Sequence, residues 1–183
     1  SHDGAGKTAV VESLLLASGA VTAVGVGKDN KHIMDFEPEE IKRNVTIQLG
    51  IAPCEWDGFK LNFLDTPGYS EFCGEVRAAL RACDGILLVV SAEAGIEMDT
   101  ERAWDYGVEL QLPRMIYVNK MDTEHADFFG SLEKMRAVFG KSIMPLQIPI
   151  GEGADFRGII DVCKMIAWEW TSGNIEEIKV PPQ

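Results

Sequence analysis

Hydrophobic residues recur along much of this chain at the spacing of an amphipathic helix. Apolar positions between residues 10 and 15 fall on one face directly after a loop of small residues, and Gly19 is a typical helix end. Three later segments repeat this helical spacing: 72–83, 99–111 and 125–139. The pattern therefore predicts a helix in each of these places, with one face buried.

Other segments have the patterns of strands. Residues 45–56 and 59–65 have strand-like patterns, and the Asp57-Gly58 pair between them is typical of a two-residue hairpin turn. The continuous apolar runs at 86–90 and 115–118 are typical of strands that are covered on both faces. Strands that alternate with helices predict an α/β fold with a doubly wound, mostly parallel sheet and an antiparallel edge hairpin. In such a fold the ligand lies at the carboxyl ends of the strands.

Two segments depart from this alternation. Residues 20–44 carry glycines and mixed charge without sustained periodicity, so we predict a long mobile loop there. Beyond Pro145 the chain shows short strand patterns: 146–150, 158–162 and 165–170. We therefore expect one domain at residues 1–144 and the beginning of an appended, truncated subdomain at 145–183.

Composition and charge narrow the possible functions. The chain has 183 residues, 46% of them hydrophobic, which suits one globular domain with a sizeable core. Its net charge of −12 disfavours sequence-independent binding to nucleic acid, so no DNA partner is expected. No apolar run reaches the ~18 residues needed to cross a bilayer, so no membrane partner is expected either. The four cysteines show no close CxxC pairing, which favours reduced thiols in a cytoplasmic protein over a zinc site.

The first candidate site is the loop SHDGAGKT at Ser1–Thr8, directly before the first helix. Its small residues would let backbone N–H groups approach phosphate oxygens, while the helix N-terminus adds positive potential. Lys7 would reach the β- and γ-phosphates, and the Thr8 hydroxyl would bind Mg²⁺. Taken alone, the run could be a glycine-rich turn before an ordinary helix. All its residues are candidate nucleotide ligands: Ser1, His2, Asp3, Gly4, Ala5, Gly6, Lys7 and Thr8.

The second candidate site is DTPG at Asp65–Gly68, which closes an apolar strand. Asp65 would hold a magnesium-bound water, and Gly68 would donate its N–H to the γ-phosphate. Thr46 could bind the same Mg²⁺ through its hydroxyl and order the preceding loop in the triphosphate state only. By themselves these residues are a common turn and a β-branched strand residue. Together with the first loop they predict a magnesium site made by Thr8, Thr46 and Asp65.

The third candidate site is NKMD at Asn119–Asp122, which follows the strand pattern at 115–118. The Asp122 carboxylate can accept hydrogen bonds from the N1–H and the exocyclic amine of guanine, whereas adenine presents the wrong donor pattern. Such charge-assisted bonds contribute roughly 1.5–3 kcal/mol each. Asn119 and Lys120 complete this candidate guanine site. Alone, the run could be a charged loop after a strand; in this order, the three runs predict a pocket for GTP or GDP with Mg²⁺.

Longer stretches carry a resemblance to a known family: MDFEPEEIKRNVTI, DTPGYSEF, VSAEAGIEMDTERAW, NKMD and PLQIPIGEGADFRGIIDV. Together with the loop lengths, they resemble the G domain of translation elongation factor G, in its elongation-factor-G-like paralogue branch. The resemblance implies the P-loop NTPase fold of a translational GTPase, with the tail from residue 145 opening that family's inserted subdomain. It also implies GTP hydrolysis in the cytoplasm by a monomeric G domain. The partners of the full-length protein would be ribosomal RNA and ribosomal proteins.

One position departs from the family at the point where hydrolysis would occur. Tyr69 stands where the family motif DTPGH has a histidine that orients the attacking water. A phenol can donate a hydrogen bond but is a poor base, so hydrolysis could be slow or could depend on the ribosome. The candidate catalytic residues are Tyr69, Lys7 and Gly68. An alternative is a GTP-dependent switch module with little hydrolysis; a tetracycline-resistance-type ribosomal protection protein or a class-II release factor is a third possibility.

Other departures concern the nucleotide pocket. The family's phosphate loop has an aspartate where Gly4 stands, and here Asp3 is one place earlier. The strand that precedes the phosphate loop, and the Ser-Ala-type loop that closes over guanine, do not occur in this sequence. We therefore expect a gap in the sheet beside the first site, and weak nucleotide binding by the chain as it stands.

Overall fold

The computed structural model describes residues 1–23, 33–43, 45–171 and 174–180. Within this part, the chain divides into two compact units. The first consists of Ser1–Val89 and Glu97–Tyr117, and the second of Val90–Ile96 and Val118–Gln183. The predicted boundary between residues 144 and 145 is therefore not where the packing divides, and it stays a prediction about subdomains. No described helix is long and apolar enough to cross a membrane.

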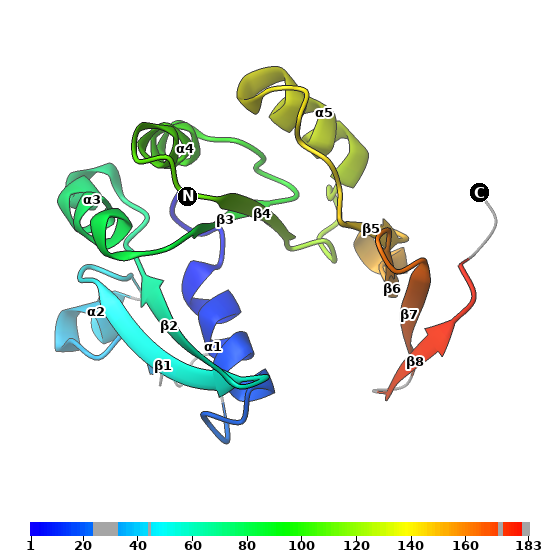
Figure 1. Ribbon diagram of the computed structural model, residues 1–183, viewed down its shortest axis with the longest axis horizontal. Coiled ribbons are helices and arrows are strands. Elements are labelled where there is room, and N and C mark those ends of the chain that lie inside the picture. The colour runs from blue at the N-terminus through cyan, green and yellow to red at the C-terminus, as the bar shows by residue number, and fades with distance from the viewer. Residues whose placement is uncertain (24–32, 44, 172–173, 181–183) are drawn as a thin grey trace. The chain divides into compact units, whose positions relative to one another are not determined.

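The first unit contains a helix packed on a hairpin. Strands β1 (Gly50–Trp56) and β2 (Phe59–Asp65) pair antiparallel from Gly50 opposite Asp65 to Trp56 opposite Phe59. Helix α1 (Lys7–Ala17) lies against this hairpin (Figure 1). The core between them is apolar and consists of four buried residues: Leu15, Met34, Ala52 and Cys54. The predicted helix and hairpin are both confirmed.

The hairpin begins later in the chain than the pattern predicts. The strand predicted at 45–56 begins at Gly50, because the preceding N–H groups are used elsewhere. Those of Ile47 and Gln48 donate to Glu40 Oε1 at 2.8 and 2.9 Å, and that of Leu49 to Glu75. Part of the predicted loop at 20–44 is also a helix, α2 (Pro38–Arg43), while residues 24–32 and 44 lie outside the described part.

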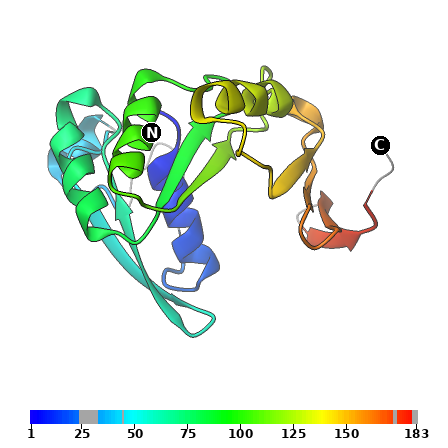
Figure 2. The ribbon, with the colours of Figure 1, turned by 45° about the horizontal axis from the view of Figure 1, so that its top comes forward.

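Two more helices cover this unit. A 3₁₀ turn, η2 (Ser70–Phe72), leads into α3 (Cys73–Ala82), and α4 (Met98–Glu109) lies beside α3 (Figures 1 and 2). Arg77 of α3 joins the pair, because its guanidinium lies 4.9 Å from the centre of the Tyr106 ring of α4.

Strands β3 (Ile86–Ser91) and β4 (Arg114–Asn119) form a second sheet and each has residues in both units. The Ile86 N–H donates to Pro113 at the start of the pair, and the Ala92 N–H donates to Asn119 at its end. The N-terminal ends of the two strands lie side by side, and so do their C-terminal ends. The two strands are therefore parallel, as predicted. Among the described strands, β1–β2 and β3–β4 are separate sheets; that a further strand belongs between them stays a prediction.

The second unit combines helix α5 (Phe128–Phe139) with a four-stranded antiparallel sheet. The strands are paired in chain order: β5 (Gln147–Ile150), β6 (Gly158–Asp161), β7 (Ile166–Thr171) and β8 (Asn174–Ile178). Three of them match predicted strands, whereas β8 was not predicted. The helix predicted at 125–139 begins at Phe128, because Asp127 caps it by accepting a hydrogen bond from the Gly130 N–H at 2.8 Å.

Candidate functional site

The loop at the start of the chain brings several backbone N–H groups together at the first turn of α1. Gly4 and Gly6 have φ angles of 71° and 92°, in the left-handed region that favours glycine. Gly6 is the N-cap of α1, and as a glycine it has no side chain to cap the helix N–H groups that follow it. Ala5 is fully buried and anchors the loop against Val10 and Val89. This geometry is that of an anion-binding loop at a helix N-terminus.

Lys7 folds back over this loop. Its Nζ donates a hydrogen bond to the His2 carbonyl oxygen at 2.9 Å. Burial lowers the pKa of Lys7 from its ordinary 10.5, and the negative charges of Asp65, Asp3 and Asp99 oppose that shift. Burial disfavours the charged ammonium of Lys7. An anionic ligand bound beside it would stabilise that charge, so Lys7 is suited to bind an anion.

Four oxygen-bearing side chains from three segments meet beside the loop. The Thr8 hydroxyl donates to Asp65 Oδ2 at 2.7 Å and lies 3.1 Å from the Thr46 hydroxyl. The Thr46 hydroxyl donates to Asp35 Oδ1 at 2.8 Å. When both hydroxyl protons point at carboxylates, the lone pairs of the two threonine oxygens face each other. A cation between them would remove the repulsion between these lone pairs. Hydroxyl and carboxylate oxygens are among the oxygen ligands that Mg²⁺ prefers.

The electrostatics of this cluster fit a cation as well. Asp65 is only 2% exposed. Burial raises the pKa of Asp65 from 3.8 to about 6, and the nearby charge of Asp35 also raises it, against the Thr8 hydrogen bond and the charge of Lys7. Two carboxylates held close together and away from water are stabilised by a divalent cation more than by water. The predicted ligands Thr8, Thr46 and Asp65 are therefore brought together, and Asp35 joins them.

The segment that carries Thr46 is held by a buried carboxylate. Glu40 is 1% exposed and accepts hydrogen bonds from the N–H groups of Glu37, Ile47 and Gln48. Burial alone would raise the pKa of Glu40, but these bonds outweigh it, and the pKa is lowered from its ordinary 4.5. Because Ile47 directly follows Thr46, the Glu40 carboxylate keeps the Thr46 side chain at the oxygen cluster.

Gly68 and Tyr69 lie against the phosphate loop. A Cβ on Gly68 would lie 2.7 Å from Asp3 Cα and 2.5 Å from Lys7 Nζ, so only glycine fits this position. Tyr69 is 40% exposed. The nearby Asp3 carboxylate raises the pKa of Tyr69, through hydrogen bonding and its negative charge. Tyr69, which departs from the family pattern, thus lies near Asp3, the residue before the departing position Gly4.

His2 does not face outward from the loop. It is buried, and its Nδ1 lies 3.1 Å from the hydroxyl of Thr100 on α4. Burial lowers the pKa of His2 below 6.5, against the charge of Glu97. The neutral ring therefore packs against α4, and the His2 side chain is engaged there and not directed at a nucleotide.

The NKMD loop belongs to the second unit and is held at its middle. Met121 is buried with Ala92 and Phe128, and its carbonyl oxygen accepts a hydrogen bond from the Gly153 N–H at 2.9 Å. Lys120 has a φ of 60°, and its carbonyl oxygen accepts from the Thr123 hydroxyl at 2.9 Å. Asn119 ends β4, while the side chains of Lys120 and Asp122 are exposed. That this loop and the phosphate loop bind one nucleotide stays a prediction.

Sequence reasoning missed two residues of this site. Asp35 and Glu40 both lie in the segment predicted as a loop, and both are buried. Acidic residues in a stretch without periodicity are normally solvated, so nothing in the pattern marked them. The only available signal was their place in the stretch that ends at Thr46.

Comparison with known proteins identifies what this site resembles. The profile of the Elongation factor Tu GTP binding domain matches residues 1–178. Elongation factor G from Thermotoga neapolitana is 37% identical over 186 residues, which cover 100% of this chain and 27% of the relative. Elongation factor G 1 from Treponema denticola is 38% identical over 174 residues, with 95% and 26% covered. The chain thus spans about a quarter of the length of these curated relatives.

A solved structure is also similar. The crystal structure of a protein from Thermus thermophilus superposes with a TM-score of 0.92 at 40% sequence identity. The similarity covers 99% of this chain and 27% of that one. The likeness therefore extends through the phosphate loop, the hairpin, the NKMD loop and the antiparallel sheet of the second unit.

Proposed function

The chain belongs to the family of elongation factor Tu GTP-binding domains, as a G domain like that of elongation factor G, and from this we propose that it binds GTP or GDP with Mg²⁺ and hydrolyses GTP. The predicted family and α/β fold class are confirmed by the profile match and by the TM-score of 0.92. The observation that best supports the activity is the oxygen cluster of Thr8, Thr46, Asp65 and Asp35 beside Lys7.

Each part of the candidate site has a chemical role in this proposal. The loop Ser1–Thr8 binds the phosphates through its N–H groups, and Lys7 neutralises the β- and γ-oxygens. Thr8, Thr46 and Asp65 hold the metal, with Asp35 accepting from Thr46. Mg²⁺ bound there would neutralise charge that develops on the phosphates. Gly68 donates its N–H to the γ-phosphate, and Asn119, Lys120 and Asp122 select guanine.

The attacking water would be oriented close to Tyr69. A phenol is a poor base at neutral pH, so Tyr69 acts by hydrogen bonding and by position, not by removing a proton. The nearby Asp3 carboxylate raises the pKa of Tyr69, which keeps the phenol protonated at neutral pH and able to hydrogen-bond a water molecule. Catalysis then comes from positioning and from charge neutralisation by Lys7 and the metal.

A second hypothesis is a GTP-dependent switch with little hydrolysis. The Asp3 carboxylate near Tyr69 favours it, because it places a negative charge beside the phosphate loop, where it would repel the attacking water's developing negative charge. In this version GTP binding would switch the loop 20–46 and so change a partner surface. GTP hydrolysis would be too slow to contribute to the function of the switch.

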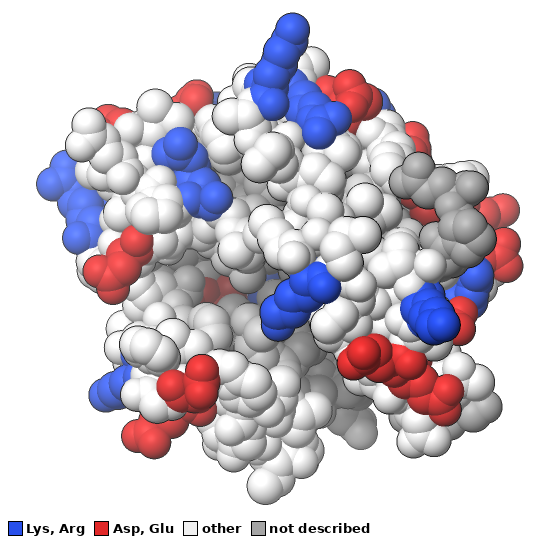
Figure 3. Space-filling view, turned by 45° about the vertical axis from the view of Figure 1, so that its right-hand side comes forward, with Lys and Arg blue, Asp and Glu red and all other residues white. Residues whose placement is uncertain are grey.

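We further propose that the full-length protein acts on the ribosome in the cytoplasm, as its similarity to elongation factor G suggests. The net charge of this chain is −12, and acidic and basic side chains are interspersed on the face drawn in Figure 3. Such a surface disfavours sequence-independent RNA binding, so the contact of this chain with the ribosome would be local.

The test combines nucleotide affinity with single-turnover hydrolysis. The intact protein should bind GTP far more tightly than ATP, and ribosomes should accelerate hydrolysis. Tyr69→Phe should abolish an appreciable rate if the phenol is catalytic. A strong rate increase in Tyr69→His at unchanged GTP affinity favours the switch hypothesis. Equal affinity for GTP and ATP would contradict both hypotheses.

A further inference from the structure

The first turn of α4 contacts two loops that lie far apart in the sequence. Thr100 is fully buried and lies 3.1 Å from His2 Nδ1 of the phosphate loop. Its neighbour Asp99 accepts hydrogen bonds from Ser70, which follows the DTPGY run. Two consecutive residues of one helix therefore hold the two loops that would face the γ-phosphate.

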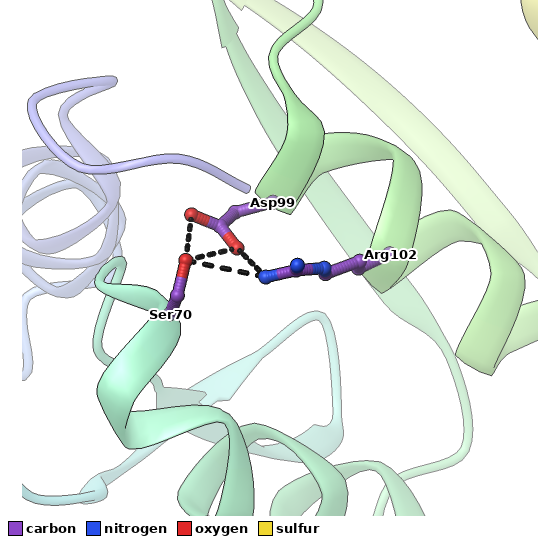
Figure 4. Close-up of polar contacts among 3 residues, drawn as sticks. All are labelled: Ser70, Asp99 and Arg102. Atoms are coloured by element: carbon purple, nitrogen blue, oxygen red, sulfur yellow. Dashed lines mark hydrogen bonds and ion pairs between the residues drawn. The ribbon is translucent and has the colours of Figure 1, made fainter.

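Ser70, Asp99 and Arg102 form a closed cluster of polar contacts (Figure 4). The Ser70 hydroxyl lies 2.9 Å from each carboxylate oxygen of Asp99. Arg102 Nη1 donates to Ser70 Oγ at 3.2 Å and to Asp99 Oδ1 at 3.1 Å. The hydroxyl is thus a donor and an acceptor at the same time. This combination fixes its direction more strictly than a single bond would.

Tyr69 lies between two anchored neighbours. On one side Gly68 lies against the backbone of Asp3, where a Cβ would have no room. On the other side Ser70 is bound to α4. Tyr69 has an extended backbone, with φ −84° and ψ 141°, and its carbonyl oxygen accepts from the Phe72 N–H at 3.0 Å. Its backbone has little freedom as long as both anchors hold.

We propose that Ser70, Asp99 and Arg102 are positioning residues, which hold Tyr69 over the phosphate loop and thereby set the rate of GTP hydrolysis without contacting the nucleotide. This inference rests on the proposed function, since Tyr69 matters only where a γ-phosphate is cleaved. All three side chains are exposed or half-exposed, and polar contacts of this type contribute little to folding stability.

The Ser70–Asp99–Arg102 cluster should therefore affect the rate of GTP hydrolysis and the position of Tyr69, with little effect on the stability of the protein. Misplacing a catalytic group by about 1 Å can lower a rate by up to about 100-fold. For Ser70→Ala in the full-length protein we expect about 5- to 20-fold slower single-turnover hydrolysis, by the same reasoning. GTP affinity should change by less than about twofold, because no contact with the phosphates is lost.

The environment of the Tyr69 side chain can be measured independently of the hydrolysis rate, by ¹⁹F NMR. With 3-fluorotyrosine incorporated at position 69, the ¹⁹F resonance should move toward that of a free fluorotyrosine in Ser70→Ala and in Asp99→Asn. Ser70→Thr keeps the hydroxyl and should keep both the resonance and the rate. Glu133→Gln is the matched control, because it removes another exposed ion pair between residues three apart, with Arg136 on α5.

The outcomes separate this inference from the proposed function. A protein that does not bind GTP contradicts the proposed function, whereas the fluorine resonance still reports on the cluster. A resonance unchanged in Ser70→Ala overturns the inference, and so does a moved resonance with an unchanged rate. Equal rate losses in Ser70→Ala and Ser70→Thr would also overturn it, because the hydroxyl would then not be the anchor.

Discussion

The hydroxyl of Thr8 donates a hydrogen bond to Asp65 at 2.7 Å, although the two residues are 57 positions apart in the chain. Thr8 belongs to the first turn of α1, and Asp65 is the last residue of β2. The bond therefore joins the helix that begins at the phosphate loop to the strand that ends at the DTPG run. Two motifs recognised separately in the sequence are therefore in direct contact.

Asp65→Asn should weaken Mg²⁺-dependent nucleotide binding. Removing the carboxylate that orients a metal-bound water typically lowers metal affinity about 10- to 100-fold. We expect GTP affinity to fall in the presence of Mg²⁺ and to change little in EDTA, as measured by titration with a fluorescent GTP analogue.

Asp57→Asn is the matched control for this change. Asp57 is an exposed residue of the hairpin turn with a φ of 49°, a conformation that asparagine tolerates. It loses the same charge as Asp65→Asn in the same unit. A similar loss of affinity in both variants would mean that net charge matters and that the oxygen cluster does not.

Glu40→Gln should destabilise the protein in a pH-dependent way. An amide can accept fewer of the N–H bonds from Glu37, Ile47 and Gln48, so we expect a loss of about 1–3 kcal/mol in unfolding free energy at pH 7. Because the folded state lowers the pKa of Glu40, its contribution is present above 4.5 and is lost as the pH falls through the lower folded value.

Urea unfolding at several pH values tests this prediction. The difference between Glu40→Gln and the wild type should be full at pH 7 and should shrink below 4.5, the ordinary pKa of the group. Glu39→Gln, on the same helix and exposed, should cost less than about 0.5 kcal/mol. A constant difference across this pH range would show that the charge of Glu40 is not what stabilises the segment.

Asp122→Asn should change the base that the protein prefers. Xanthine carries a carbonyl where guanine has its amine, so an amide at position 122 can pair with it while a carboxylate cannot. Losing a charge-assisted bond should lower GTP affinity by about 10- to 150-fold, whereas xanthosine triphosphate should bind more tightly than to the wild type. Competition titrations with both nucleotides measure this, with the exposed neighbour Glu124→Gln as control. Unchanged preference would remove Asp122 from the guanine site.

Asp127→Ala should destabilise the second unit without changing nucleotide chemistry. Its carboxylate caps α5 by accepting from the Gly130 N–H at 2.8 Å, and loss of such a cap costs about 0.5–2 kcal/mol. Asp127→Asn keeps the capping oxygen and should cost much less. Hydrogen exchange of the amides in α5 gives the local measurement. Equal protection in Asp127→Ala and the wild type would show that the cap contributes nothing.

The residue pattern by itself determined most of the helices, most of the strands and the three motifs of the candidate site. These are local properties: helical spacing, continuous apolar runs and short runs with defined chemistry depend only on neighbours in the chain. For this reason the predicted elements at 86–90, 99–111 and 115–118 match β3, α4 and β4 closely.

Tertiary structure alone decided which side chains meet. Asp35 and Glu40 became part of the site through burial, and Asp3 met Tyr69 only after the chain folded. The late start of β1 has the same origin, since the carboxylates of Glu40 and Glu75 accept hydrogen bonds from the N–H groups that a strand would have used. A carboxylate in a segment without periodicity has no pattern that marks it as buried, and its partner is selected by how the folded segments pack.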